Sequence, residues 1–273
     1  MPKAPFPVAP VLQTFEKQFE TRIASLRLAE KWDNIGFLVE SPRAKDCNKL
    51  RILTCIDLTN EVVSEAIAQQ SNLIVSYHPV MFRGIHSLSM TSQSPIIRCI
   101  DSGISVFTPH TAVDSAPGGM NDYLGDMFSS LEISREAIRV DPTSSAEVGR
   151  VVRLRSEIAL RDIIEIIKSF LGMNVVRYCS KHDPSETLVR SIGICVGSGS
   201  SVLMGCDADL YLTGEMSHHD LLSCNSADKS VILLDHSSSE RPFLPELSKR
   251  LRELDNVETV FVSEMDVEPI RSA

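Results

Sequence analysis

"LRILTCIDLTNEVVSEAIAQQSNLIVS", residues 50–76, is the stretch that decides the fold class. It begins with an apolar run at 50–58 and ends with another at 72–76. Between them lies a helix-forming segment that Thr59 or Asn60 can cap. Short apolar runs without alternation are typical of strands that are buried on both faces of a parallel sheet. The stretch therefore predicts a βαβ unit.

The same alternation of apolar runs and helical patterns extends in both directions from this unit. The polar, turn-rich segment 129–147 interrupts it and predicts a domain boundary. We predict an α/β protein whose further helices lie within 11–29, 95–101, 121–128 and 160–172 and before the last strand. The further predicted strands lie within 104–108, 149–155, 174–179, 190–201, 208–215, 230–234 and 257–262.

The length and composition limit the classes of protein that the chain can represent. At 273 residues it is long enough for one large or two modest domains. Its net charge of -9 and the absence of a long Lys/Arg run argue against nucleic acid as a partner. Its seven cysteines include no CxxC pair, which favours reduced thiols over disulfides or a zinc-thiolate site.

Two further features concern membranes and location. No segment approaches the ~20 consecutive apolar residues that span a bilayer. The first 20 residues have no apolar signal core, and they carry Glu16 and Glu20. We expect no membrane association and a cytoplasmic location, with nuclear and mitochondrial locations as open alternatives.

Candidate metal ligands follow three of the predicted strands. His78 lies in SYHPV, His110 and Asp114 lie in TPHTAVDSAPGG, and His236 and Glu240 lie in LLDHSSSE. Imidazole and carboxylate donors together suit Zn²⁺, Mn²⁺ or Fe²⁺. Because ligands of open α/β sheets bind at the ends of strands, we hypothesise that the three segments converge on one site.

Each segment alone also has a purely structural interpretation. His78 precedes a proline and can simply mark the end of a strand. Asp114 can cap the loop before the turn sequence APGG. Ser237 and Glu240 match a capping box at the start of a helix. Only the combination of the three segments favours a metal site.

Two other polar clusters leave alternatives open. The GSGSS loop at 197–201 can bind an anion through its amides, but an ordinary Gly-Ser turn is the favoured interpretation. In TGEMSHHD, Glu215 and His219 are four residues apart, so on one helix they would share a face as a proton relay or extra ligand. The alternative is a charged first turn in which Glu215 and Asp220 interact with the helix dipole.

Five stretches together resemble one known family. They are EKWDNIGFLVE, NLIVSYHPVMFRGIHSL, FTPHTAVDSAPGGMNDYLGD, ADLYLTGEMSHHDLL and DHSSSE. In this order they resemble the motifs of the NGG-one-interacting-factor-three-like family, whose bacterial members are often labelled GTP cyclohydrolase type-two homologues. The match spans 32–240, and VSEMD near the C-terminus extends it to nearly the whole chain.

The resemblance implies two α/β domains in which helices and sheets pack in layers. Residues 1–130 plus 228–273 would form a metal-site domain, in which the C-terminal segment completes the N-terminal one. Residues 131–227 would form an inserted α/β domain. The resemblance also implies a homohexamer built from dimers and trimers, with a dinuclear metal centre.

Site residues follow from the resemblance where the motifs match. The ligands would be His78, Asp114, His236 and Glu240, with Glu240 as the bridge. Near the centre, the candidates for proton transfer or for orienting the ligands would be His110 and His219, to which the sequence pattern adds Glu215.

Tyr77 is the departure from the bacterial pattern, which has two adjacent histidines where this chain has Tyr77 and His78. The tyrosine form resembles the eukaryotic branch. A phenol has a pKa near ~10, so ionising it at neutral pH costs roughly 4 kcal/mol, which a metal ion can supply. We therefore predict one firm site with His78, Asp114 and Glu240. A weaker second site would rest on His236 and Glu240, with Tyr77 as the ligand in question.

Three functions remain open at this stage. The first is a metal-dependent hydrolase that cleaves a phosphorylated or nucleotide-like small molecule through a metal-activated water. The second is a regulatory or protein-interaction protein with a structural metal. The third is a fold that has lost its chemistry. The cyclohydrolase label is only an analogy, because no purine-binding motif supports it.

Overall fold

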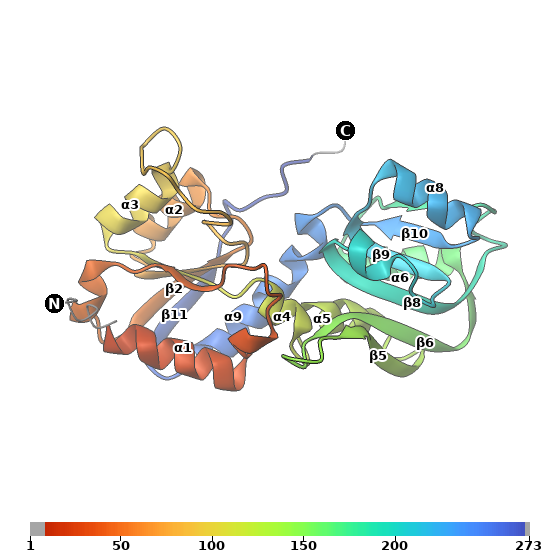
Figure 1. Ribbon diagram of the computed structural model, residues 1–273, viewed down its shortest axis with the longest axis horizontal. Coiled ribbons are helices and arrows are strands. Elements are labelled where there is room, and N and C mark those ends of the chain that lie inside the picture. The colour runs from red at the N-terminus through yellow and green to blue at the C-terminus, as the bar shows by residue number, and fades with distance from the viewer. Residues whose placement is uncertain (1–8, 271–273) are drawn as a thin grey trace. The chain divides into compact units, whose positions relative to one another are not determined.

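The protein is described here from a computed structural model that covers residues 9–270 (Figure 1). The start of the segment that argues against a signal peptide, residues 1–8, lies outside the described residues. The chain divides into two compact units. Unit 1 runs to Val113 and includes Leu244–Val267, and unit 2 comprises Asp114–Phe243 and the residues from Glu268 onward.

Unit 1 is built on a five-stranded sheet with the strand order β1-β4-β3-β2-β11. Only β1 is antiparallel to its neighbour; the other three pairings are parallel. The strands are β1 (Gly36–Val39), β2 (Leu50–Cys55), β3 (Leu73–Ser76), β4 (Ser105–Thr108) and β11 (Val257–Val262). The helices are α1 (Pro10–Arg22), α2 (Asn60–Ala68), α3 (Ser94–Ser102) and α9 (Leu244–Arg252).

Helices cover both faces of this sheet (Figure 1). On one face, α2 and α3 bury apolar side chains against alternate strand residues such as Leu53 and Val106. On the other, Phe15 and Phe19 of α1 pack edge-on or tilted against Phe107, with ring centroids 5.2 and 4.9 Å apart. Neighbouring residues Val106 and Phe107 thus point to opposite faces, as the period of a strand requires.

The βαβ prediction for residues 50–76 is confirmed. Strands β2 and β3 are parallel, and α2 connects them. Of the two candidate caps, Thr59 is the N-cap, and its side chain accepts a hydrogen bond from the amide of Val62. The α/β fold class is confirmed as well, since β11 near the C-terminus pairs with β2 and so completes the N-terminal sheet.

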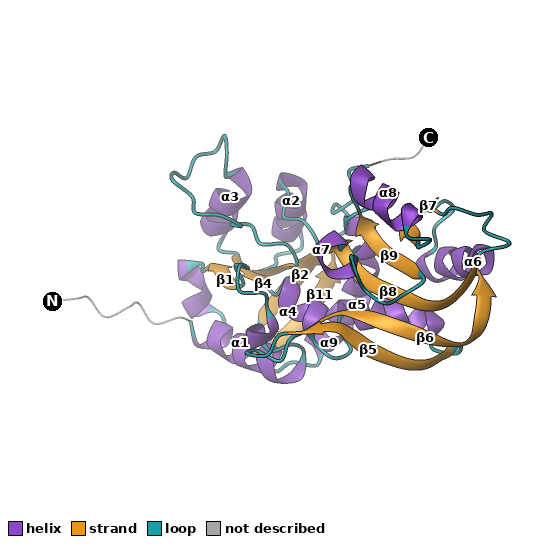
Figure 2. Ribbon diagram, turned by 45° about the vertical axis from the view of Figure 1, so that its right-hand side comes forward, coloured by secondary structure: helices purple, strands orange, loops and turns teal. Residues whose placement is uncertain are grey.

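Unit 2 contains a six-stranded mixed sheet with the order β5-β6-β8-β9-β10-β7 (Figure 2). Strands β8, β9 and β10 run parallel, and the others pair antiparallel. The strands are β5 (Glu132–Val140), β6 (Glu147–Ala159), β7 (Arg177–Cys179), β8 (Leu188–Ser198), β9 (Leu210–Glu215) and β10 (Ser230–Leu233). The helices are α4 (Thr111–Ser115, at the boundary of the units), α5 (Met120–Gly125), α6 (Leu160–Leu171), α7 (Ser200–Leu203) and α8 (His218–Ser226).

The segment 129–147, predicted to be a turn-rich domain boundary, contains a strand. The segment 129–147 does not consist of turns alone, because β5 occupies Glu132–Val140 and pairs with β6. β5 is an edge strand with no buried residue, and its charged and apolar side chains do not alternate regularly, which explains why the sequence pattern did not indicate a strand. The predicted domain limits at residues 130 and 228 stay a prediction beside the observed units.

None of the seven cysteines forms a disulfide, as the scattered spacing predicts. In the part of the chain that the structure describes, no helix is both long and apolar enough to cross a membrane.

One buried ion pair in unit 2 yields a stability prediction. The Arg150 side chain is 3% exposed, and its Nε and Nη2 atoms donate to the two Asp122 carboxylate oxygens at 2.7 and 3.0 Å. Asp122→Asn would leave the buried guanidinium with only the more distant and 47% exposed Glu147 carboxylate, 3.7 Å away, so we expect a loss of roughly 3 kcal/mol in the free energy of unfolding. Asp126→Asn removes a 59% exposed partner of Arg135 and should cost less than about 1 kcal/mol. Urea denaturation at pH 7 measures both.

The same pair has a predictable pH dependence. Burial raises the pKa of Asp122, but hydrogen bonds and charge from Arg150 outweigh it, so the pKa is lowered overall. The stabilisation is therefore fully present above the ordinary aspartate pKa of about 4 and is lost as pH falls through the lowered value. If the stability difference between wild type and Asp122→Asn is unchanged under strongly acidic conditions, the explanation is wrong.

Candidate metal centre

His78 lies just beyond the end of β3 in unit 1. The pairing of β2 with β3 sets Cys55 opposite Ser76, and the backbone bond from the His78 amide to Ile56 continues it. This register brings Asp57, two residues beyond β2, beside His78. The His78 Nδ1 atom lies 2.9 Å from Asp57 Oδ1, which fixes the ring orientation and directs its Nε2 atom away from Asp57.

His110 is held by a second carboxylate in the same unit. Gly36 of β1 pairs with Thr108 of β4 in antiparallel register, so the residues before β1 lie beside those after β4. His110 Nδ1 is 2.7 Å from Asp33 Oδ1, and Thr111 donates its amide to the other carboxylate oxygen at 3.2 Å. Burial raises the pKa of Asp33, but the hydrogen bond and charge of His110 outweigh it and lower the pKa overall.

The backbone of His110 is itself unusual. Its φ angle is +35°, in a region that residues other than glycine rarely adopt. Such strain persists only where surrounding contacts impose it, and it is common at functional sites. The Asp33 contacts supply that restraint. The centroid of the His110 imidazole ring lies 5.5 Å from that of the His78 ring and 5.3 Å from that of the Tyr77 ring.

A third imidazole–carboxylate pair lies in unit 2, at the ends of the parallel strands β9 and β10. Leu233 pairs with Thr213, so the residues that follow these strands lie side by side. His236 Nδ1 is 2.9 Å from Glu215 Oε1, and His236 Nε2 is 3.4 Å from Glu240 Oε1. The Glu240 side chain is only 2% exposed, so a carboxylate is held in a dry position beside an imidazole.

Gly197, at the end of β8, makes room for these two side chains. Its φ is +60°, and a Cβ atom placed on it would lie 2.6 Å from Glu240 Oε1 and 3.2 Å from His236 Nε2. The amides of Gly197 and Gly199 donate to the hydroxyls of Ser239 and Thr213. The GSGSS segment thus spans the end of β8 and the start of α7 and packs against residues that follow β10, and anion binding by its amides stays a prediction.

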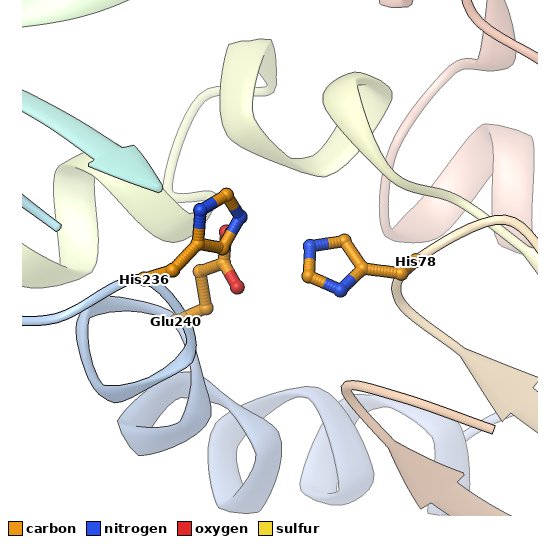
Figure 3. A group of neighbouring side chains, drawn as sticks. All are labelled: His78, His236 and Glu240. Atoms are coloured by element: carbon orange, nitrogen blue, oxygen red, sulfur yellow. The ribbon is translucent and has the colours of Figure 1, made fainter. Parts of the chain in front are cut away.

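Figure 3 draws His78, which belongs to unit 1, with His236 and Glu240, which belong to unit 2. Each offers a donor that suits a divalent metal ion, an imidazole nitrogen or a carboxylate oxygen. Asp114 lies in α4, and Tyr77 is 2% exposed with its ring centroid 5.0 Å from that of His78. Their roles as ligands stay predictions.

The prediction that Glu215 and His219 share a helix face is wrong. Glu215 is the last residue of β9, whereas α8 begins at His218 with Ser217 as its N-cap. Ser217 accepts from the Asp220 amide and donates to its carboxylate, so Asp220 belongs to the helix cap. Strand β9 continues to Glu215, and its register with β10 places the Glu215 side chain beside His236. His219 is exposed on α8, and its role in proton transfer stays a prediction.

The contact between His78 and Asp57 gives a testable consequence. Loss of an outer carboxylate that orients a metal-binding imidazole typically weakens metal affinity 10- to 100-fold. We expect this loss for Asp57→Ala, with little change in stability, because the Asp57 side chain is 46% exposed. Competition against a chromophoric Zn²⁺ chelator measures the affinity. Asp101→Ala, an exposed carboxylate on α3, serves as the control and should bind like wild type.

With the geometry in hand, comparison with known proteins identifies the family. The family model described as Duf34/NIF3 (NGG1p interacting factor 3) matches residues 15–269. The chain belongs to the NIF3 family. A Drosophila melanogaster NIF3-like protein 1 is 38% identical over 89% of this chain and 82% of its own length. The Saccharomyces cerevisiae NGG1-interacting factor 3 is 36% identical over 93% of this chain and 94% of its own length.

A solved structure has a similar fold. A Staphylococcus aureus hypothetical protein matches 97% of this chain and 100% of its own chain, with a TM-score of 0.81 and 23% identity. At that identity the likeness concerns the fold alone. The resemblance to the eukaryotic branch of the NIF3 family, inferred from the sequence motifs, is confirmed by the Drosophila and Saccharomyces relatives.

Two site residues were missed by sequence reasoning. Asp57 closes the apolar run at 50–58, which is the same strand-end signal that singled out the histidines. Asp33 lies in the WDN segment, residues 32–34, which interrupts the helical pattern within 11–29. A polar break between two apolar segments is only a weak indication of a functional residue. Their partners depend on strand register, which the sequence does not state.

Proposed function

We propose that this NIF3-family chain is a divalent-metal-dependent hydrolase that acts on a phosphorylated or nucleotide-like small molecule. The observation that carries the proposal is the pair of His236 and the buried Glu240 carboxylate in unit 2, 3.4 Å apart. We propose that His78 of unit 1 joins them to form one metal-binding group. The carboxylates at Nδ1 of both histidines support it, because metal-binding imidazoles are usually oriented in this way. Zn²⁺, Mn²⁺ and Fe²⁺ suit these donors.

The residues fit a bound cation on chemical grounds. A carboxylate as buried as that of Glu240 is costly unless positive charge compensates it. The missing side chain at Gly197 leaves the space that the Glu240 Oε1 and His236 Nε2 atoms occupy. When bound, a divalent ion lowers the pKa of a coordinated water toward neutrality and so supplies the nucleophile for hydrolysis.

We assign proton transfer to His110. Asp33 fixes its Nδ1 atom, which leaves Nε2 as the atom that exchanges a proton with substrate or water. Glu215 orients His236 and is assigned to positioning rather than to proton transfer. His219 is the second candidate for the proton, as the sequence suggested.

Metal content tests the proposal. We further propose one firm site with His78, Asp114 and Glu240 and a weaker one with His236 and Glu240. Elemental analysis should find about one equivalent of metal per chain in wild type and about two in Tyr77→His. A neutral imidazole binds a metal ion directly, whereas a phenol must first lose a proton whose pKa is about 10. Hydrolysis of p-nitrophenyl phosphate should require added Mn²⁺ or Zn²⁺ and should rise in Tyr77→His.

The outcomes separate the parts of the proposal. Two tightly held equivalents in wild type would show that the second site is not weak. Absence of metal from both proteins would reject the metal-dependent function. Metal without hydrolysis of any phosphoester would favour a structural metal.

A second candidate function rests on the name of the Saccharomyces relative, NGG1-interacting factor 3. We propose protein interaction as the alternative activity, with the metal in a structural role, and a homohexamer as the assembly. Light scattering tests the hexamer. The cytoplasmic location, with its nuclear and mitochondrial alternatives, stays a prediction.

A further inference from the structure

Two large aromatic side chains of unit 1 stand exposed beside His110. Trp32 is 58% exposed and Phe82 is 52% exposed, although their rings contact each other with centroids 5.7 Å apart. Both rings also contact His110, at 5.9 and 6.4 Å. Exposed aromatic residues that cluster at a site, rather than singly, mark a binding surface.

The pair is fixed in place by the residues next to Trp32. Asp33 binds His110 and Thr111, as described above, and the Asn34 side chain donates to the carbonyl oxygen of Met81 at 2.5 Å. The WDN segment thus ties the loop before β1 to the loop that carries Phe82. A surface held by hydrogen bonds on both sides keeps its shape before a ligand arrives.

The pair lies next to the proposed chemistry. The His110 ring contacts Trp32 on one side and the His78 ring, at 5.5 Å, on another. All of these contacts lie within unit 1. The aromatic faces therefore adjoin both the proposed proton-transfer residue and a proposed metal ligand, where part of a substrate must rest.

We propose that Trp32 and Phe82 form a stacking platform for a planar heteroaromatic ring of the substrate, such as a nucleobase. This inference rests on the proposed function and names the part of the substrate that gives affinity. Stacking on aromatic side chains binds any base through its π-face and needs no purine-specific hydrogen bonds. That agrees with the absence of a purine-binding motif from the sequence. Lys31 and Arg83, both exposed, are the chain neighbours of the two rings and suit an anionic substituent.

The single tryptophan makes the platform directly observable. Trp32 is the only tryptophan of the chain, so its fluorescence reports on this surface alone. Guanosine and adenosine 5′-monophosphate should quench it saturably, whereas ribose 5-phosphate, which lacks the base, should not. Phe82→Ala should weaken nucleotide binding roughly 5- to 150-fold, the range that corresponds to loss of one stacking partner.

Two variants control this experiment. Phe82→Leu keeps an apolar side chain without a π-face and should lose nearly as much affinity as Phe82→Ala. Tyr178→Ala removes a 50% exposed aromatic residue of β7 in unit 2 and should bind nucleotide like wild type. Unchanged affinity in Phe82→Ala, or equal quenching by ribose 5-phosphate, would reject the platform and leave a protein partner as the occupant of this surface.

Metal content of the same samples separates this inference from the proposed function. Bound metal without nucleotide quenching would reject the platform and leave the metal centre standing. Nucleotide quenching by protein that holds no metal would support the platform and reject the metal-dependent function.

Discussion

His236→Ala is expected to lower divalent-metal affinity by more than about 100-fold while the protein stays folded. The reason is that His236 is a donor of the proposed metal-binding group and also contacts buried Glu240, 3.4 Å away. Loss of a carboxylate that only orients a metal-binding imidazole lowers metal affinity up to about 100-fold, so loss of the imidazole itself should lower it more. The His236 side chain is 38% exposed, so its removal opens little space in the core. Metal-dependent phosphoester hydrolysis should fall with the metal.

His182→Ala is the matched control for this variant. His182 is also a histidine of unit 2 beside a carboxylate, with Nε2 3.3 Å from Asp228 Oδ1, but it is 56% exposed and is not part of the group. It should bind metal like wild type. If His236→Ala retains full metal content, or if both variants lose it equally, the assignment of His236 as a ligand fails. Circular dichroism checks that both variants are folded.

Gly197→Ala is expected to weaken metal binding as strongly as loss of a ligand. The new Cβ would lie 2.6 Å from Glu240 Oε1, well inside contact distance, and the Glu240 side chain must move to relieve it. Glu240 is buried, so the displaced carboxylate has little space to rest beside His236. The backbone φ of +60° should also lower the free energy of unfolding of this variant by about 1 to 2 kcal/mol, because left-handed backbone is costly for L-residues.

Gly172→Ala isolates the backbone cost from the steric one. Gly172 follows α6 with a φ of +67°, and no atom lies within 4 Å of the position of its added Cβ. This variant should lose a similar backbone contribution to stability and retain metal affinity. Isothermal titration with Zn²⁺ and urea denaturation of both variants separate the two effects. Equal metal affinity of Gly197→Ala and Gly172→Ala would mean that the clash does not reach the ligands.

The sequence was sufficient where a local pattern determines the element. Residues 50–76 form the predicted βαβ unit because their two short apolar runs, which flank a helical pattern, are typical of central strands buried on both faces. The family followed from five ordered motifs. Sequence reasoning failed at β5, an exposed edge strand without a strong apolar pattern, and at Glu215, whose strand runs longer than the helical spacing suggested.

The pairing of the site residues was decided only by the tertiary structure. Each histidine that the sequence places after a predicted strand has a carboxylate partner beside it: Asp57 follows β2, Asp33 precedes β1 and Glu215 ends β9. Which carboxylate it meets depends on strand order and register, and these arise from packing across the whole sheet rather than from local composition. The sequence alone therefore determined the fold class, the family and the kinds of ligand. The tertiary structure decided which carboxylates orient the histidines and why Gly197 must lack a side chain.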